Sequence, residues 1–398
     1  MVSSMVGENG DAISHIRASP AEGIPHGDYR LVGWDMDTTG KMLVDEICQI
    51  AGYTPSSSFA QYVMPFKNLT PAAKKRHNLK VVTVGKYRLL KNSKTNKVLK
   101  TKSEISAITD FLDWLEEVKG DAADGVILIH HESRKVIPAM LLASLIKFNL
   151  LERFKKTVKG FANGFNIANV KCANTIRAFS LRTLSRVLLD QEVELEDASE
   201  RARLALQIVQ HLSIGEAKAT EGSGDNNTTS KATIEFTREF VQPVEAEETE
   251  SEELKLVLDR QHSLLPVFGH LLAMNRKERQ HASPLRRLLA ESNIDYAQLK
   301  ETWSKEEKYG LEKLIKDRAS SATNTEIEDL LEILECHFDP EKTPKVKVET
   351  KQRKRSKKNK ENRKDASGIE SPDTTTLHSP IKVTNESLDN AEVSPTTA

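Results

Sequence analysis

The sequence predicts an α/β domain followed by an all-α domain, on three observations. Apolar strands alternate with amphipathic helices between residues 28 and 213, which is the pattern of an α/β fold. Between residues 255 and 340, apolar residues recur at helical spacing without strand alternation. At 398 residues the chain is long enough for two domains of about 100 to 200 residues each.

Composition limits the possible classes of protein only weakly. Lys plus Arg and Asp plus Glu both number 58, so the whole-chain charge is zero and indicates no class of partner. Aromatic residues make up 5% of the chain, which predicts sizeable unstructured segments. The cysteines Cys48, Cys172 and Cys336 lack metal-ligand spacing and are expected to be buried thiols in a reducing compartment. Because no 18 consecutive residues are apolar, we expect a cytoplasmic protein with no membrane partner.

The first domain is predicted to begin with a buried strand at Tyr29, after a disordered leader over residues 1–27. This strand is YRLVGWDMDTT, and DGVILIHH is a second buried strand. Helical spacing of apolar residues predicts helices in SEISAITDFLDWLEEV, PAMLLASLIKFNLLERF, FSLRTLSRVLL and EDASERARLALQIVQHL. We expect this domain to end near residue 213.

Residues 214–254 are polar, and a run of glutamates closes them, so they are predicted to be an acidic flexible linker. Residues 255–340 are expected to fold as five short helices. Their segments are LPVFGHLLAM, SPLRRLLAES, AQLKETW, YGLEKLIKD and TEIEDLLEILECHF. Residues 341–398 are basic and then rich in Ser, Thr and Pro, which predicts a disordered tail without a core.

An acidic pair at the end of the first strand is the sharpest local signal. Asp35 and Asp37 are separated by one residue, so both side chains emerge on the same face of an extended strand. A divalent cation needs two carboxylates in this arrangement. A strand-to-turn acidic cluster without metal is the alternative, and it stays open at this point.

The segment DMDTTG resembles the first motif of the DEDD 3′-5′ exonucleases, Asp-x-Glu-Thr-Thr-Gly, with Asp37 in place of Glu. The segment HHESRK is similar to their second motif, with Lys135 where these enzymes have a metal-binding Asp. Asp197 and the alanine after it resemble the third motif, with Glu192 at the position of the general base. The resemblance spans residues 29–213 and implies a ribonuclease H-like fold.

These departures predict a catalytically inactive domain. Two-metal hydrolysis requires carboxylates that bridge both cations, and Lys135 would oppose the second cation. Glu192 stands in place of the His or Tyr that acts as the general base in these enzymes, so the neutral proton acceptor is lost. Asp35, Asp37 and Asp197 are therefore expected to be vestigial and to form a salt bridge with Lys135. No cofactor is expected. A single structural cation is the open alternative.

Further segments together resemble the exuperantia family. They are DMDTTGKMLVDEICQIAGYTP, QYVMPFKNLTPAAKKRH, HHESRKVIP, LLERF, SLLPVF and CHFDPEKT, and the similarity covers about residues 29–345. This resemblance implies an exonuclease-like domain without a full active site, followed by a SAM-like helical domain. It also implies homodimerisation, RNA and ribonucleoprotein partners, and a role in localising maternal mRNA to the anterior of the oocyte in ribonucleoprotein granules.

Three basic regions are candidates for contact with RNA phosphates. The tail from Lys342 to Lys364 holds twelve Lys or Arg and two Glu, which predicts a salt-dependent contribution to binding. The second region lies within the helical domain, where it is expected to form a basic end to a pair of short helices. The third joins the segment KKRH after Pro71 with the lysines that follow it, beside the predicted substrate groove. The candidates in the first two regions are Arg276, Lys277, Arg279, Arg286, Arg287, Arg353, Lys354, Arg355, Lys357 and Lys358.

The function predicted from these features is an RNA-binding adaptor that uses an inactive exonuclease-like domain for dimerisation. Two alternatives stay open. One is an active DEDD exonuclease, and the other is a protein scaffold in which the SAM-like bundle polymerises and the basic tail is incidental.

Overall fold

The structure is a computed structural model and describes residues 21–133, 136–220, 226–339 and 341–342. The predicted tail lies outside these residues from position 343 onward, and so does the predicted leader up to position 20. The rest of the leader prediction is wrong, because Ile24 is buried and the Gly23 N–H donates to the carbonyl of Val241 at 2.9 Å. Among the described helices, none is long and apolar enough to cross a membrane.

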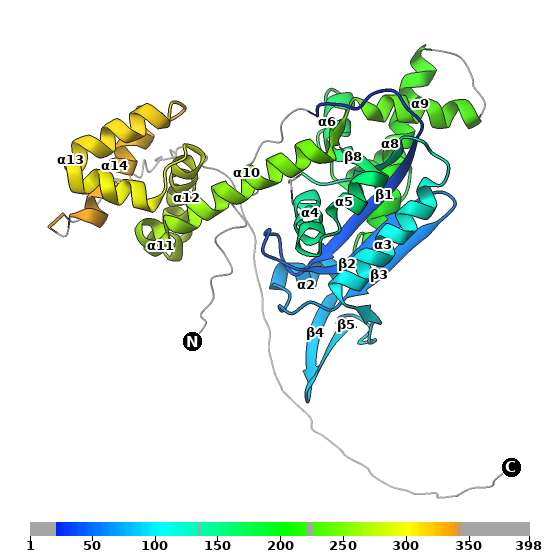
Figure 1. Cartoon of the computed structure of the whole chain (residues 1–398), viewed down its shortest axis with the longest axis horizontal. Coiled ribbons are helices and arrows are strands. Elements are labelled where there is room, and N and C mark those ends of the chain that lie inside the picture. The colour runs from blue at the N-terminus through cyan, green and yellow to red at the C-terminus, as the bar shows by residue number, and fades with distance from the viewer. Residues whose placement is uncertain (1–20, 134–135, 221–225, 340, 343–398) are drawn as a thin grey trace, which may run out of the picture. The chain divides into compact units, whose positions relative to one another are not determined.

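A seven-stranded sheet forms the centre of the first domain, with strand order β6-β3-β2-β1-β7-β8-β9 (Figure 1). β1 pairs antiparallel with β2 and parallel with β7, and β7 pairs parallel with β8. The predicted strands are thus confirmed as the two in the middle of the sheet. The strands are β1 (Tyr29–Thr38), β2 (Ile47–Tyr53), β3 (Ser58–Val63), β6 (Thr101–Lys102), β7 (Gly125–His130), β8 (Val158–Asn163) and β9 (Val241–Pro243).

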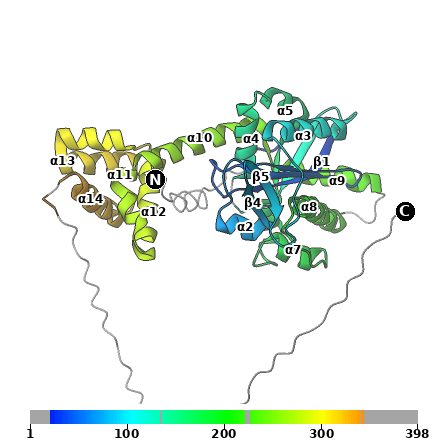
Figure 2. The same cartoon turned by 90° about the horizontal axis from the view of Figure 1, so that it is seen from below.

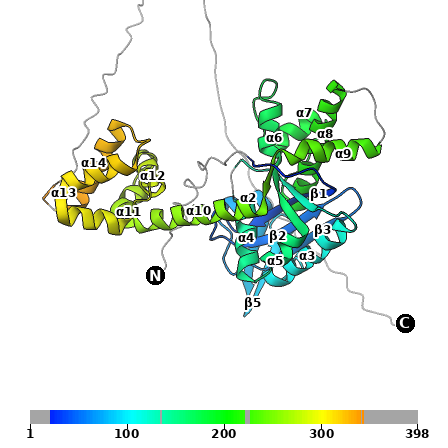
Figure 3. The same cartoon turned by 45° about the horizontal axis from the view of Figure 1, so that its top comes forward.

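Helices cover both faces of this sheet (Figures 2 and 3). On one face, α3 (Glu104–Lys119), α4 (Ile137–Lys147) and α5 (Leu151–Thr157) share a core with Trp34 and Leu128. The other face is covered by α6 (Gly164–Lys171), α7 (Leu181–Leu188), α8 (Ala198–Thr220) and α9 (Asn226–Arg238). The alternation of side chains along β1 therefore separates Val32, Trp34 and Met36 from Gly33, Asp35 and Asp37, which face α8.

β1 and α8 approach each other closely at Gly33. A Cβ added there would lie 2.1 Å from the backbone oxygen of Ala202 in α8. Only glycine allows this approach, because any side chain would push the helix away from the strand. The contact places the N-terminal turns of α8 directly over the acidic end of β1.

A smaller antiparallel sheet is formed by β4 (Leu79–Val84) and β5 (Tyr87–Asn92) (Figure 1). α2 (Pro71–His77) precedes β4, and the side chain of Thr70 caps the N-terminus of α2. Leu79 and Leu90 are buried in a small core that α2 covers.

The prediction of a flexible linker over residues 214–254 is wrong. Within it α8 continues to Thr220, α9 follows, β9 pairs with β8, and α10 (Val244–Ser263) begins. Acidic residues favour the start of a helix, because they interact with its dipole, and α10 carries Glu245 and Glu247 in its first turn. Val244 is buried in the core of the first domain, so apolar contacts fix this segment as well.

The helical domain consists of α11 (Leu265–Ala273), α12 (Arg276–Glu291), α13 (Tyr296–Arg318) and α14 (Asn324–Phe338), with the end of α10. Glu307 has non-helical backbone angles and divides α13 into two helical pieces. The prediction of five helical segments is therefore confirmed. Cys48 and Cys172 are buried as expected, whereas Cys336 in α14 is partly exposed.

We predict that Gly33→Ala lowers the free energy of unfolding by about 1–3 kcal/mol, because the added methyl group overpacks the contact between β1 and α8. Gly269→Ala in α11 is the matched control, since its Cβ would meet no atom within 4 Å. That control should stabilise the protein by up to about 1 kcal/mol through helix propensity. Urea denaturation of full-length protein measures both, and equal midpoints would contradict the close approach.

Candidate functional site

The carboxylates of Asp35 and Asp37 lie on the same face of β1, as their spacing predicts, and both are buried. Between them lies the guanidinium group of Arg201, which α8 supplies. Its Nε donates to Asp35 Oδ2 at 2.9 Å and its Nη2 donates to Asp37 Oδ1 at 2.6 Å. One buried arginine therefore bridges the acidic pair and balances one of its two negative charges, in the position where a metal ion was the sequence-based alternative.

A second side chain, His77 of α2, approaches Asp37. Its Nδ1 lies 2.5 Å from Asp37 Oδ1, within ion-pair distance but without hydrogen-bond geometry. Burial raises the pKa of Asp37, but the charge of Arg201 and the interactions with His77 outweigh it and hold the pKa below its ordinary value. Asp37 is therefore an anion at neutral pH.

The other residues predicted to be vestigial add no side chain to this cluster in the described part of the chain, although the backbone carbonyl of Asp197 accepts the N–H of Arg201 at 3.3 Å. Asp197 Oδ1 accepts hydrogen bonds from Gln49 Nε2 at 3.0 Å and from the Ser199 N–H at 2.9 Å, at the start of α8. Glu192 is exposed in the segment before α8, and Lys135 lies outside the described residues. Among described residues, no group of three or more His, Cys, Asp or Glu side chains is arranged to hold a metal ion.

Arg201 was missed in the sequence, although a signal was present. The helix was identified by its apolar face, which includes Ala205 and Val209, and Arg201 stands four residues before Ala205 on the same face. A cation on the buried stripe of a helix requires an anionic partner in the core. Asp35 and Asp37, at the end of an apolar strand, were the acids available as partners, although Lys135 was predicted to pair with them.

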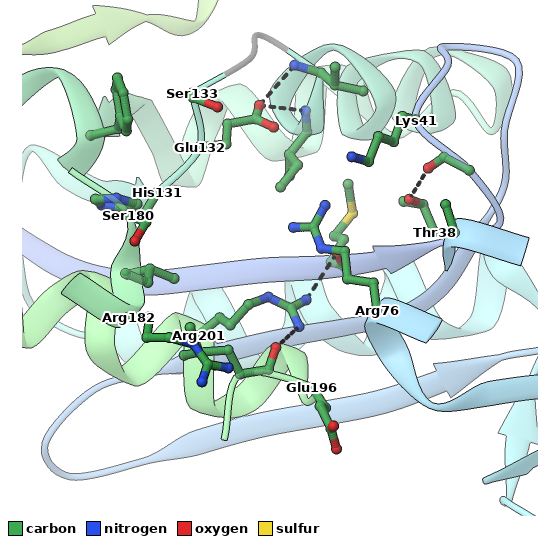
Figure 4. A pocket seen from close by; sticks show the side chains of 18 of the residues that line it. Thr38, Lys41, Arg76, His131, Glu132, Ser133, Ser180, Arg182, Glu196 and Arg201 are labelled. Atoms are coloured by element: carbon green, nitrogen blue, oxygen red, sulfur yellow. Dashed lines mark hydrogen bonds between the residues drawn. The ribbon is translucent and has the colours of Figure 1, made fainter. Parts of the chain in front are cut away.

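A cavity of about 680 Å³ opens beside the Asp35–Arg201–Asp37 cluster (Figure 4). Five cations line it, from four different parts of the domain, against two carboxylates. Lys41 and Arg76 point towards its middle. Of the two carboxylates, Glu196 is paired with Lys94 at 2.6 Å. The cations are Lys41, Lys75, Arg76, Arg182 and Arg201.

Glu132, the other acid in this cavity, has a raised pKa that favours its protonated form. Burial raises its pKa to about 8, although its Oε1 accepts the backbone N–H groups of Val136 and Ile137 at 2.8 and 2.9 Å. These bonds satisfy donors at the start of α4. Arg201 is paired with the two aspartates of β1, and the other four cations keep the cavity wall predominantly positive, which favours an anionic ligand.

In the helical domain, the basic candidates lie on the single helix α12 rather than at the ends of two short helices. Arg276, Lys277 and Arg279 are exposed in its first turns. Arg286 is 2% exposed, so it is not available to a phosphate, and that prediction is corrected. Arg287 is partly buried and lies 3.5 Å from Glu291. The tail candidates Arg353, Lys354, Arg355, Lys357 and Lys358 lie outside the described residues.

Comparison with known proteins gives the family. Residues 29–188 match the Exuperantia RNAse H-like domain, and residues 265–337 match the Exuperantia SAM-like domain. The chain is 36% identical over 373 residues to the maternal protein exuperantia of Drosophila virilis, a match that covers 84% of this chain and 75% of the relative. The chain belongs to the exuperantia family. The exuperantia protein of Drosophila melanogaster is also 36% identical, over 378 residues that cover 80% of this chain and 70% of the relative.

Membership of the exuperantia family confirms the predicted order of an RNase H-like domain and a SAM-like domain. The exuperantia RNase H-like match ends at residue 188, but the domain continues in space through α8, α9 and β9. The cation that bridges the acidic pair is thus supplied from beyond the matched segment.

We predict that Arg201→Met lowers the free energy of unfolding by about 3–5 kcal/mol, because two buried carboxylates lose their cation. The triple variant Arg201→Met, Asp35→Asn and Asp37→Asn should recover part of this loss. Arg186→Met, at an exposed position of α7, is the control. Urea denaturation that found Arg201→Met as stable as the control would contradict the assignment.

The raised pKa of Glu132 predicts a pH-dependent stability. The folded protein keeps a proton that the unfolded chain releases above about pH 4.5, so stability should fall as the pH rises towards about 8 and then level off. Glu132→Gln imitates the protonated acid and removes this dependence. Thermal melting of both proteins should therefore show a difference that favours Glu132→Gln and grows from pH 5 to pH 8. A constant difference would show that Glu132 is ionised in the folded protein.

Proposed function

We propose that this protein is an RNA-binding adaptor in the localisation of maternal mRNA to the anterior of the oocyte, and that its RNase H-like domain is catalytically inactive. The observation that carries the proposal is the guanidinium of Arg201 between Asp35 and Asp37, beside a cavity that keeps a positive wall. Relatives of this chain are maternal proteins by name.

Inactivity follows from what the carboxylate oxygens already bind. Asp35 Oδ1 accepts the N–H of Met36 at 2.6 Å, and Asp35 Oδ2 accepts Arg201. Asp37 Oδ1 contacts both Arg201 and His77. A divalent cation would have to displace a guanidinium that is itself buried, and like charges would oppose its entry. Asp197 is engaged with Gln49 and Ser199, so it does not complete a metal site.

The start of α12 supports RNA binding by the SAM-like domain. Arg276, Lys277 and Arg279 place three exposed cations within the first turns of this helix. Cations at a helix N-terminus oppose the helix dipole and cost folding free energy of about 0.3–1 kcal/mol each. A cluster that is unfavourable for the fold and accessible to solvent fits a surface for phosphates, which neutralise it on binding.

Homodimerisation through the RNase H-like domain, ribonucleoprotein partners and a cytoplasmic location in ribonucleoprotein granules belong to the same proposal. Their support is the resemblance to the exuperantia family.

Purified full-length protein should bind a fluorescent stem-loop RNA in Mg²⁺ with an affinity that falls steeply with salt, and the recovered RNA should be intact on a gel. Replacing Arg276, Lys277 and Arg279 by Gln should reduce the slope of log affinity against log salt by roughly two to three, because each phosphate contact contributes about 0.7–0.9. The matched control replaces the exposed Lys156, Arg186 and Lys255 by Gln.

Either of two results would contradict the proposal. RNA shortened from its 3′ end would identify an active exonuclease, and this activity should then disappear in Asp35→Ala. Absence of binding at low salt would leave protein assembly as the role of the SAM-like domain, and light scattering would detect such assemblies.

A further inference from the structure

One segment of the RNase H-like domain carries charge of a single sign. Between Glu46 and Glu104 the chain contains twelve Lys or Arg and no Asp or Glu, although the whole chain is neutral. The segment forms β2, β3, α2, the β4–β5 hairpin and β6, all within the described residues. Such a concentration of positive charge on one part of a domain is typical of a surface that binds nucleic acid.

The register of the hairpin separates its side chains into two faces. Leu79, Val81 and Leu90 pack into the small core with α2. Because side chains alternate along a strand and directly opposed residues share a face, the remaining positions form the other face, here called the outer face. The outer face contains three opposed pairs, which are Lys80 with Lys91, Val82 with Leu89 and Val84 with Tyr87.

The lysine pair on the outer face is unfavourable for the isolated domain. Like charges directly opposed across two strands destabilise the pairing. The Nζ of Lys80 donates to Asn96 Oδ1 at 2.6 Å, a neutral acceptor, and in the described part of the chain neither lysine pairs with a carboxylate. An anion bound between Lys80 and Lys91 would convert this repulsion into attraction.

An exposed aromatic ring lies near the tip of the same face. Tyr87 is 63% exposed and its opposed partner Val84 is 54% exposed. The Nζ of Lys86 lies 5.4 Å from the centre of the Tyr87 ring. An exposed aromatic ring beside cations is the arrangement on which proteins stack unpaired bases while they contact the phosphates.

We propose that the outer face of the β4–β5 hairpin binds single-stranded RNA, with phosphates at Lys80 and Lys91 and a base stacked on Tyr87. This inference rests on the proposed RNA-binding function and adds a site in the RNase H-like domain. Single-stranded RNA is the ligand, because stacking on a side chain requires an unpaired base. An acidic protein would pair with the lysines, but its carboxylates would not stack on the exposed ring of Tyr87 as an unpaired base does.

α2 continues the positive surface from the hairpin to the cavity. It lies next to β4 (Figure 2), and its Lys75 and Arg76 line the cavity wall. In the described part of the chain, neither side chain pairs with a carboxylate. Because α2 packs against the inner side of the hairpin, these cations add positive charge near the hairpin but are not part of the outer face.

Binding of a fluorescein-labelled oligouridylate to full-length protein tests the site, with a stem-loop RNA measured in parallel. The variant that combines Lys80→Gln, Tyr87→Ser and Lys91→Gln should bind the oligouridylate about tenfold more weakly, through lost stacking and phosphate contacts. Its salt slope should fall by about one to one and a half, since each contact to a single strand contributes about 0.7. Lys156→Gln with Lys255→Gln is the control for charge.

Two further measurements separate a binding role from a structural one. Lys91→Gln alone should not lower the melting temperature, because it removes a like-charge pair. Ultraviolet crosslinking of the oligouridylate, followed by peptide mass spectrometry, should place a crosslink at Tyr87. A folded triple variant with unchanged affinity for the oligouridylate would overturn the hairpin site.

The same data separate a failure of the proposed RNA-binding function from a failure of the hairpin site. Wild-type protein that binds neither RNA would overturn both the proposed function and the hairpin site. Wild-type protein that binds the stem-loop and not the oligouridylate would overturn the hairpin site alone. A third result is that the triple variant keeps its RNA affinity and loses the ability of the wild type to sediment with phosphatidylserine vesicles. That result would identify an anionic membrane surface, and not RNA, as the ligand of the outer face.

Discussion

The bridging of two buried carboxylates by one buried guanidinium is the interaction on which the RNase H-like domain depends. Asp35 and Asp37 lie at the end of a strand in the middle of the sheet, where an unpaired charge is strongly unfavourable. Gly33 removes the side chain that would keep α8 at a distance, and the close contact brings Arg201 within hydrogen-bond range. The contact between β1 and α8 and the ion pairs of Arg201 therefore depend on each other.

Under the proposed function, this arrangement separates nucleic-acid binding from hydrolysis. A two-metal nuclease needs carboxylate oxygens that are free to coordinate cations, and here Arg201 and His77 contact them. The walls of the neighbouring cavity and the adjacent hairpin remain positive. A domain of this kind can hold a polyanion without cutting it, which an adaptor for RNA transport requires.

Much of the fold follows from local patterns in the sequence. Apolar runs identified β1 and β7, the spacing of Asp35 and Asp37 placed both on one face, and helical periodicity gave the five segments of the second domain. The errors share a cause, because residue type was taken as a guide to exposure. Arg201 and Arg286 lie on buried helical stripes, and the glutamates at residues 245–253 belong to a helix fixed by Val244 and Leu254. These positions depend on partners distant in the sequence.

The buried charge cluster also has an evolutionary consequence. Replacement of Arg201 alone would leave two carboxylates without a partner, and replacement of either aspartate would leave the guanidinium with fewer acceptors. Each single replacement therefore gives a less stable protein. Under the proposed function, Asp35 and Asp37 persist as counterions of an arginine, and this mutual dependence opposes any return to a metal centre.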